Sequence, residues 1–153
     1  MPLINAAATA TFGERTKEID LILPSASATV QGNDIILRQV VSNIMLNAFE
    51  ALGGQGKRGR IEVSISTPPN ATGFTQIGIS DNGEGIAHNR LEEIFRRGVS
   101  TRRQRTGGLG LHWCANAIKV LGGNIRAESA GPGCGATIFI ELPSFATLRH
   151  EAA

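Results

Sequence analysis

Residues 80–86 read Ser-Asp-Asn-Gly-Glu-Gly-Ile, a stretch in which an apolar strand runs into a tight, glycine-rich loop. The alternating pattern of Phe74 to Asp81 predicts the strand. Asp81 stands at its end, where the side chain can stay inside a pocket while Gly83 and Gly85 let the backbone turn and approach a flat ligand. A buried carboxylate is costly unless a donor meets it, and an exocyclic amine such as that of adenine would do so. A plain Asp-Asn-Gly hairpin turn is the alternative.

An amphipathic helix is predicted before this loop. Asp34 is a suitable N-cap, and apolar residues recur at the spacing of one helix face as far as Leu52, where glycines 53–54 end the helix. Asn43 and Asn47 lie four residues apart and so share one face of it. A partly buried amide oxygen is a suitable ligand for Mg²⁺, which keeps waters and substrate phosphates as its other ligands. A polar helix edge that holds two asparagines is the alternative.

A third motif, Thr106 to Leu111 (TGGLGL), opens a second long helix predicted over Leu109–Leu121. Backbone N–H groups at a glycine-rich helix start, with the helix dipole behind them, form an anion site suited to phosphates. No Lys-Ser/Thr follows and no β-α-β unit surrounds the motif. It is therefore neither a Walker A loop nor a dinucleotide-binding fingerprint.

The remaining segments predict a sheet. Further strands are expected at Glu18–Leu23, Arg60–Thr67, Asn124–Ser129 and Ala136–Leu142, with a short hairpin partner at Ala28–Gln31 and a short helix at Asn89–Phe95. The strand at Arg60–Thr67 is expected to pair antiparallel with Phe74–Asp81. Without regular β-α-β alternation, the fold class is α+β: a two-layer sandwich with a mixed, mostly antiparallel sheet and helices on one face.

Composition describes one ordinary globular domain. The chain has 153 residues, of which 41% are hydrophobic and 18% charged, and a net charge of +2 that is too small to imply nucleic acid. No stretch reaches the roughly 18 apolar residues of a membrane span, so no direct membrane contact is expected. Two cysteines make no disulfide framework, and a cytoplasmic location is the default. We expect a flexible segment at 1–17, the domain at 18–145 and a tail at 146–153.

The order Asn-x-x-x-Asn-Ala, Asp-x-Gly-x-Gly, Phe95 and Gly-Leu-Gly-Leu closely resembles the ATP-binding domain shared by histidine kinases, DNA gyrase, MutL and a heat-shock chaperone. The resemblance runs from about Glu18 to Pro143. It implies the Bergerat fold, in which the nucleotide lies between the helices and a flexible lid. The residues expected to contact the nucleotide are Asn43, Asn47, Asp81, Gly83, Gly85, Ile86, Phe95, Arg102, Gly108, Leu109, Gly110, Leu111 and Thr137.

The resemblance also implies roles. Asn47 would be the Mg²⁺ ligand with Asn43 as its phosphate-side neighbour, and Asp81 would accept from the adenine amine with help from Thr137. Gly83 and Gly85 would shape the adenine pocket, Phe95 would precede the lid, and Gly108 and Gly110 would offer backbone donors to the phosphates. An arginine cluster that includes Arg102 is the expected source of a cation for the phosphates, with a solvated charge run as the alternative.

Asn43 separates the branches of this superfamily. Gyrase-like ATPases and anti-sigma serine kinases carry a glutamate there, four residues before the Mg²⁺ asparagine, and a neutral amide cannot act as a base. This favours the histidine kinase branch, and the wording of residues 47–51 (NAFEA) and 110–113 (GLHW) looks most like its nitrogen-regulation type.

None of the three histidines, His88, His112 and His150, stands in a phospho-accepting context, and there is no room for a two-helix hairpin before Glu18. The expected partners are therefore ATP, a separate histidine-bearing dimerization domain and a downstream response regulator. The domain is expected to be cytoplasmic, alone or as part of a membrane-anchored sensor. Two rivals stay open: an anti-sigma-type serine kinase, and a nucleotide-gated binding module without transfer activity, for which Leu46 and Phe49 could form a partner surface.

Overall fold

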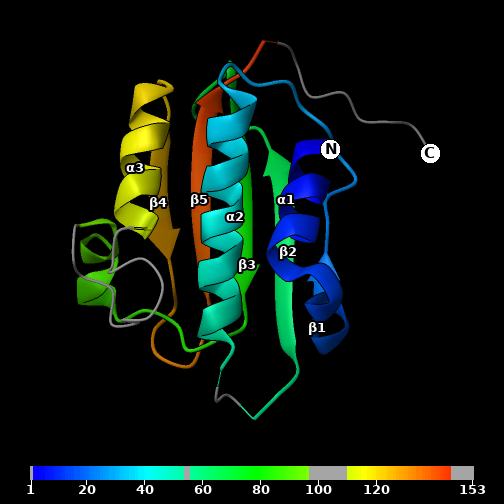
Figure 1. Cartoon of the computed structure of the whole chain (residues 1–153). Coiled ribbons are helices and arrows are strands. Elements are labelled where there is room, and N and C mark those ends of the chain that lie inside the picture. The colour runs from blue at the N-terminus through cyan, green and yellow to red at the C-terminus, as the bar shows by residue number, and fades with distance from the viewer. Residues whose placement is uncertain (1, 54–55, 97–109, 146–153) are drawn as a thin grey trace.

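The protein is described by a computed structural model that covers residues 2–53, 56–96 and 110–145 (Figure 1). Its α-helices are α1 (Pro2–Phe12), α2 (Asp34–Ala51) and α3 (Gly110–Val120). Its strands are β1 (Ile19–Ile22), β2 (Gly59–Ser66), β3 (Phe74–Asp81), β4 (Asn124–Glu128) and β5 (Ala136–Pro143). Short 3₁₀ turns are η1 (Gly13–Glu18), η2 (His88–Arg90) and η3 (Glu93–Phe95), of which the last two take the place of the short helix predicted at Asn89–Phe95.

The five strands form one sheet in the order β1-β2-β3-β5-β4. Only β1 and β2 run parallel; the pairs β2–β3, β3–β5 and β4–β5 are antiparallel. The predicted pairing of the second and third strands is thereby confirmed. β3 is the central strand of the sheet, so the loop that follows Asp81 begins at the end of the central strand.

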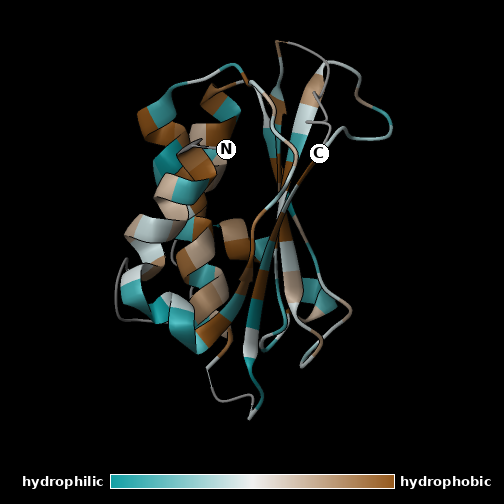
Figure 2. Cartoon of the chain, turned by 90° about the vertical axis from the view of Figure 1, so that its right-hand side faces the viewer, coloured by the Kyte–Doolittle hydropathy of each residue, from teal (hydrophilic) through white to brown (hydrophobic). Residues whose placement is uncertain are grey.

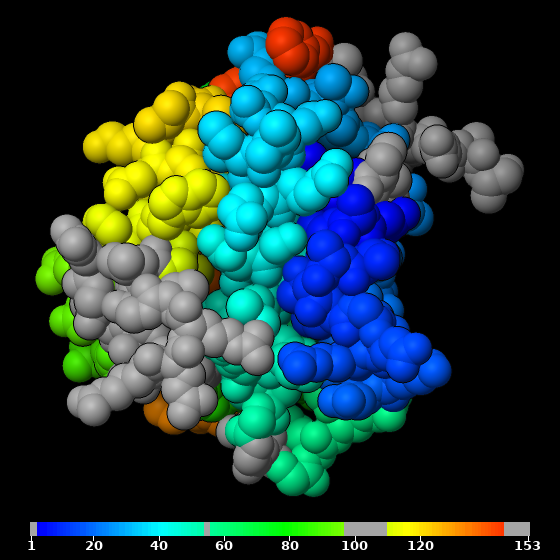
Figure 3. Space-filling model, in the orientation of Figure 1, coloured from blue at the N-terminus to red at the C-terminus, as the bar shows by residue number. Residues whose placement is uncertain are grey.

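The helices cover one face of the sheet, as the view along the sheet in Figure 2 shows. On that face α2 lies between α1 and α3 (Figure 3). The core between the two layers is made of the inward side chains of α2, such as Leu37, Val41, Ile44 and Ala48, and of alternate strand residues, such as Ile61, Val63, Ile79 and Ile140. The predicted class, an α+β two-layer sandwich, is confirmed, because one apolar helix face and one apolar sheet face bury each other.

The first long helix begins one residue earlier than predicted. Asn33, not Asp34, is the N-cap: its backbone is extended, and its Oδ1 accepts from the amides of Ile35 (2.9 Å) and Ile36 (3.2 Å). Both residue types cap helices well, so composition alone does not choose between neighbours. Asp34 instead occupies the first turn, where its charge complements the helix dipole.

Pro2–Phe12, which lie within the segment expected to be flexible at 1–17, form helix α1. Ile4, Ala7, Ala8 and Phe12 of this helix are buried in the common core. The ring of Phe12 lies 5.8 Å from that of Phe49 on α2. A short Ala- and Thr-rich stretch is a marginal helix by itself, and packing against α2 stabilises it.

The hairpin predicted between Glu18–Leu23 and Ala28–Gln31 does not form. β1 pairs with β2, and the later segment instead meets the end of β5: Val30 forms a bridge with Ser144, and the amide of Gln31 donates to Pro143 O at 2.8 Å.

Among the described residues, no helix has the length and apolar character required to cross a membrane. The predicted lid and the tail at 146–153 lie outside the described residues.

Candidate functional site

Asp81 occupies the position that the sequence predicts, at the end of β3. It lies two and four positions after Ile79 and Ile77, which are 1% and 4% exposed, so its side chain is on the same sheet face as theirs, the one that the helices cover. The carboxylate is half-buried, and its Oδ1 accepts from the Gly83 amide at 2.8 Å. The backbone of the loop thus fixes the direction of one carboxylate oxygen of Asp81.

The loop after Asp81 packs against the end of helix α2. The Glu84 amide donates to Ala51 O at 2.9 Å. A Cβ on Gly83 would overlap that same carbonyl oxygen. Glycine was expected here so that the backbone could approach a ligand, which stays a prediction; the structure adds a second reason, because the backbone of α2 leaves no room for a side chain at Gly83.

Gly83→Ala is therefore expected to destabilise the domain. The methyl group must displace the α2 carbonyl or the loop, a form of overpacking that costs about 1–3 kcal/mol of unfolding free energy. Gly53→Ala is the matched control, since a Cβ there meets nothing closer than Glu50 O at 3.5 Å, and it should change the free energy by less than about 0.5 kcal/mol. Urea unfolding of both variants measures the difference, and equal stabilities would contradict this packing role.

A second loop, between β4 and β5, is hydrogen-bonded to the loop after Asp81. Gly85 has a φ of 71°, and a side chain there would overlap Gly131 O. The Gly133 amide donates to Glu84 O (2.6 Å), and the Gly135 amide donates to Gly83 O (3.1 Å). The two glycine-rich loops therefore form one unit beside Asp81.

The two asparagines of α2 lie on one side of the helix, half-buried, as predicted. Oδ1 of Asn43 accepts from Nε2 of Gln39 at 3.0 Å. Asn43 also reaches Cys114 on α3, where its hydrogen bond opposes the larger effect of burial, which raises the pKa of the Cys114 thiol to about 12. Asn47 lies one turn closer to Ala51, and hence to the loop after Asp81. The contact with Cys114 places the Asn43 side chain toward α3, whereas Asn47 is the asparagine nearer to the end of α2 on which the Asp81 loop packs.

His112, for which the sequence predicted no role at the site, joins Phe95 to the start of α3. Nδ1 of His112 lies 3.1 Å from Phe95 O, and its Nε2 lies 3.2 Å from Nδ2 of Asn116. A neutral imidazole that donates from Nδ1 and accepts at Nε2 satisfies both contacts. Leu111 and Phe95 are half-buried and pack against the core. No pattern in the sequence indicated the link, because it joins a carbonyl to a side chain across 17 positions.

The third motif, Thr106 to Leu111, is described only from Gly110 onward, where α3 begins. Gly110 and Leu111 occupy the first turn of the helix, as predicted, although the helix is described as starting one residue later than Leu109. The other residues of this motif in the prediction, Gly108 and Leu109, lie outside the described residues, and so does Arg102.

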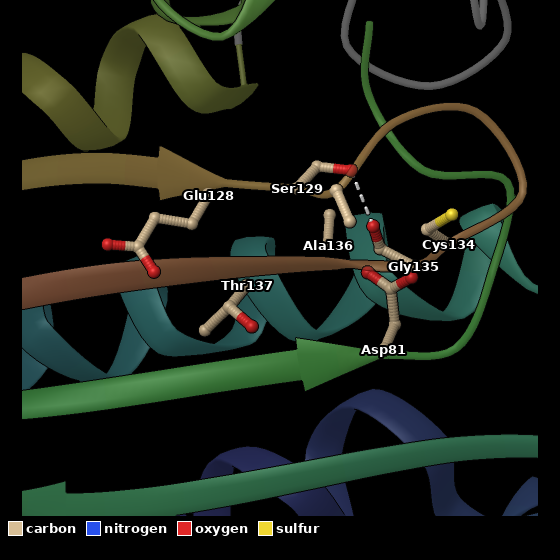
Figure 4. Close-up of a pocket in the computed structure, with 8 residues that line it drawn as sticks. Asp81, Glu128, Ser129, Cys134, Gly135, Ala136 and Thr137 are labelled. Atoms are coloured by element: carbon tan, nitrogen blue, oxygen red, sulfur yellow. Dashed lines mark hydrogen bonds between the residues drawn. The ribbon is translucent and has the colours of Figure 1, made fainter. Parts of the chain in front are cut away.

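A pocket of about 350 Å³ opens where β3 and β4 end and β5 begins (Figure 4). It is lined by Asp81, Glu128, Ser129, Ala130, Cys134, Gly135, Ala136 and Thr137. Asn43 and Asn47 are not part of its lining. Asp81 and Thr137, from the neighbouring strands β3 and β5, thus line the same pocket. Asn43 and Asn47 lie in the helix layer, on α2.

The predicted part of Thr137 in holding adenine stays a prediction, and the structure shows where its side chain lies. Although Thr137 lines the pocket, it alternates with the buried residues Ile138 and Ile140 and so stands on the sheet face that the helices leave uncovered. Its hydroxyl lies 2.7 Å from the hydroxyl of Ser80. In the β3–β5 register the residue opposite Asp81 is Ala136. The hydroxyl of Thr137 therefore lies beside the hydroxyl of Ser80, its neighbour across the β3–β5 pair.

Within the described ranges, no group of three or more His, Cys, Asp or Glu side chains is placed to hold a metal ion. A metal here would have to be one that accepts few protein ligands and fills its shell with water and substrate phosphates. Mg²⁺ is such a cation, and the half-buried amide of Asn47 supplies the oxygen ligand that it prefers. The donor set fits Mg²⁺ delivered together with a phosphate compound.

Residues 32–145, which include both asparagines, the Asp81 loop and all of β5, match the family described as histidine kinase-, DNA gyrase B-, and HSP90-like ATPase. The chain is 34% identical over 118 residues to the sensor histidine kinase ZraS of Klebsiella oxytoca, a match that covers 77% of this chain and 24% of that protein. It is 36% identical over 131 residues to the C4-dicarboxylate transport sensor protein DctB of Rhizobium meliloti (strain 1021), covering 86% and 20%. The chain thus spans a quarter or less of the length of these relatives.

Solved structures share the fold. The mycobacterial sensor histidine kinase MprB superposes with a TM-score of 0.81 at 23% identity, covering 95% of both chains. The nucleotide-free catalytic domain of the histidine kinase ThkA gives 0.76 at 26% identity, covering 94% of this chain and 91% of that one. None of these relatives tests the nitrogen-regulation type, which stays a prediction. The chain belongs to the family of histidine kinase-, DNA gyrase B- and HSP90-like ATPases, and it corresponds to the ATP-binding catalytic domain of sensor histidine kinases.

Proposed function

We propose that this chain binds Mg-ATP and donates the γ-phosphate to a histidine on a separate dimerization and phosphotransfer domain. The observation that carries the proposal is Asn43. Its neutral amide stands where the hydrolysing relatives are expected to have a glutamate, and its Oδ1 already accepts from Gln39 at 3.0 Å. An amide cannot take a proton from water. The site is therefore suited to holding ATP in position rather than to hydrolysing it.

Each residue of the site has a role in this proposal. Asp81 accepts from the adenine amine, and Gly83, Gly85, Ile86 and Phe95 are proposed to contact the nucleotide. Asn47 holds Mg²⁺, which would neutralise phosphate charge, the main requirement of phosphoryl transfer. The amides of the glycine-rich motif, from Gly108 to Leu111, bind the phosphates, with the dipole of α3 behind Gly110 and Leu111. Arg102 is proposed as a further phosphate contact.

The accepting histidine has to come from elsewhere. Both ring nitrogens of His112 are engaged, at 3.1 Å from Phe95 O and 3.2 Å from Asn116. His88 is exposed on the short turn η2. Neither histidine is followed by the acidic residue and Asn/Arg-Pro sequence that the family's accepting helix is expected to carry. A separate histidine-bearing domain, with a response regulator downstream in the cytoplasm, completes the proposal.

The rival interpretation as a nucleotide-gated binding module loses one of its supports. Phe49 was expected to offer an apolar surface to a partner, but its ring packs beside Phe12 at 5.8 Å, and the Arg15 guanidinium lies 5.9 Å from the ring centre. Helix α1 and the residues after it therefore cover Phe49 from within the chain. The serine kinase interpretation requires a base at position 43, and Asn43 provides none.

The test is transfer from labelled Mg-ATP. Incubated alone, the chain should bind nucleotide, hydrolyse it very slowly and acquire no acid-labile phosphohistidine. A histidine-bearing dimerization domain added in trans should become labelled, at a low rate because separate molecules lose the effective concentration of a tethered pair. The same domain with its histidine replaced by alanine is the control. Robust labelling of the chain on one of its own histidines, or labelling of a serine in a partner, would overturn the proposal.

A further inference from the structure

Ser129, directly after β4, joins the two loops that meet beside Asp81. Its Oγ accepts from the Ile86 amide at 3.0 Å and from the Gly131 amide at 3.2 Å. The same hydroxyl donates to Gly135 O at 2.6 Å, the contact drawn in Figure 4. One side-chain atom therefore holds the loop after β3 and both limbs of the loop between β4 and β5.

The hydroxyl of Ser129 has no hydrogen-bonding capacity to spare for a ligand. A serine hydroxyl offers one hydrogen and two acceptor lone pairs. The two amides use both lone pairs, and the hydrogen goes to Gly135 O; Gly131 O, at 3.3 Å, is the more distant of its two acceptors. Ser129 lines the pocket but acts on the backbone around it.

Those backbone contacts lead to Asp81 in two steps. The carbonyl of Gly135 accepts from Ser129, and the N–H group of the same residue donates to Gly83 O at 3.1 Å. The Gly83 amide in turn donates to Oδ1 of Asp81 at 2.8 Å. Ile86, at the far end of the same loop, is held directly by Ser129. The loop between Asp81 and Ile86 is thus fixed at its middle and at its end by one hydroxyl.

We propose that Ser129 is a positioning residue for recognition of the base: it sets the loop that aims the Asp81 carboxylate. The inference rests on the proposed function, in which that carboxylate meets the adenine amine. Loss of the hydroxyl leaves the amides of Ile86 and Gly131 without this acceptor and frees Gly135. The carboxylate then loses its fixed direction while the residues that hold the phosphates are unchanged.

The chain offers a matched control. Ser80, like Ser129, is a half-buried serine at the sheet edge near Asp81, and its hydroxyl bonds the Thr137 hydroxyl at 2.7 Å. Ser80→Ala therefore removes the same atom and a hydrogen bond of similar length. Its side chain stands on the uncovered face of the sheet, so the Asp81 loop keeps all of its contacts.

The test is the ratio of ATP to GTP affinity, measured by calorimetric titration of the whole chain. Ser129→Ala should reduce the preference for ATP about tenfold, because the half-buried amides of Ile86 and Gly131 lose their acceptor and the carboxylate of Asp81 loses its fixed direction. Ser80→Ala should keep the wild-type ratio, and Ser129→Thr, which retains the hydroxyl, should restore it. A purely structural role would lower the melting temperature and leave the ratio of the folded protein unchanged.

Two results would overturn the inference. The first is a wild-type ratio in Ser129→Ala together with a lower melting temperature. If that variant does not fold, Ser129→Cys carries the same test, since the slightly larger thiol leaves no cavity but bonds amides weakly, and a wild-type ratio there is equally decisive. The second is a wild-type protein that binds ATP but does not distinguish it from GTP, which removes the role of Asp81 itself. A wild type that binds no nucleotide sinks the proposed function instead.

Discussion

Asp81→Asn should weaken ATP binding by about tenfold to a hundredfold without unfolding the domain. The carboxylate offers acceptors only, whereas an amide presents an NH₂ group that can face the adenine amine donor to donor. The loss of a hydrogen bond to a charged group, about 1.5–3 kcal/mol, corresponds to that range. Oδ1 of the amide can still accept from Gly83, so the loop keeps its contact. Calorimetric titration with ATP gives the affinity, and thermal unfolding checks the fold.

Asp20→Asn is the control for this variant. Asp20 is an aspartate on the outer strand β1, paired with Arg58 at 2.6 Å and with a side chain that is 54% exposed. The same change of a carboxylate to an amide there should leave ATP affinity unchanged, since exposed ion pairs contribute little. Wild-type affinity in Asp81→Asn, or equal loss in both variants, would remove Asp81 from base recognition.

Asn47→Ala should reduce ATP affinity in the presence of Mg²⁺ by at least about tenfold. Loss of residues that merely support a metal ligand costs roughly 10–100-fold in metal affinity, and the loss of a direct ligand should cost no less. Mg²⁺ has few protein ligands to replace it. Affinity measured in EDTA should change much less, because the metal is then absent from both variants.

The metal dependence separates a ligand from a structural residue. Asn124→Ala is the matched control: Asn124 is an exposed asparagine at the start of β4, remote from α2, and the variant should bind ATP as the wild type does with and without Mg²⁺. An equal fall of Asn47→Ala affinity in Mg²⁺ and in EDTA would show that Asn47 serves the packing of α2 and holds no metal.

Local patterns in the sequence determined much of the fold. The helix-period apolar residues predicted α2 to within one residue at each end, and the alternation of Phe74–Asp81 predicted β3 at its observed bounds. These patterns succeed because each reports which face of one element is buried, and burial of that face stabilises the element wherever its partner comes from. The order of the motifs was likewise sufficient to name the family that residues 32–145 match.

Contacts between distant segments decided the rest of the fold. Helix α1 has little polarity to mark an outer face, and it forms because Phe12 and its neighbours are buried against α2. The pairing of β1 with β2 and of Val30 with Ser144 joins residues that lie far apart in the chain. Composition and periodicity carry no information about which remote strand a short segment will join.

At the site, the sequence by itself determined the chemistry of single residues: a carboxylate at the end of a strand, an amide four residues after another, and glycines in between. Only the tertiary structure decided how they are held. Register placed the Thr137 hydroxyl beside the hydroxyl of Ser80. Packing against the backbone of α2 leaves no room for a side chain at Gly83. The hydrogen bonds of Ser129 with Ile86, 43 positions away, follow no local pattern, because a side chain that bonds backbone groups places no demand on the identity of its partners.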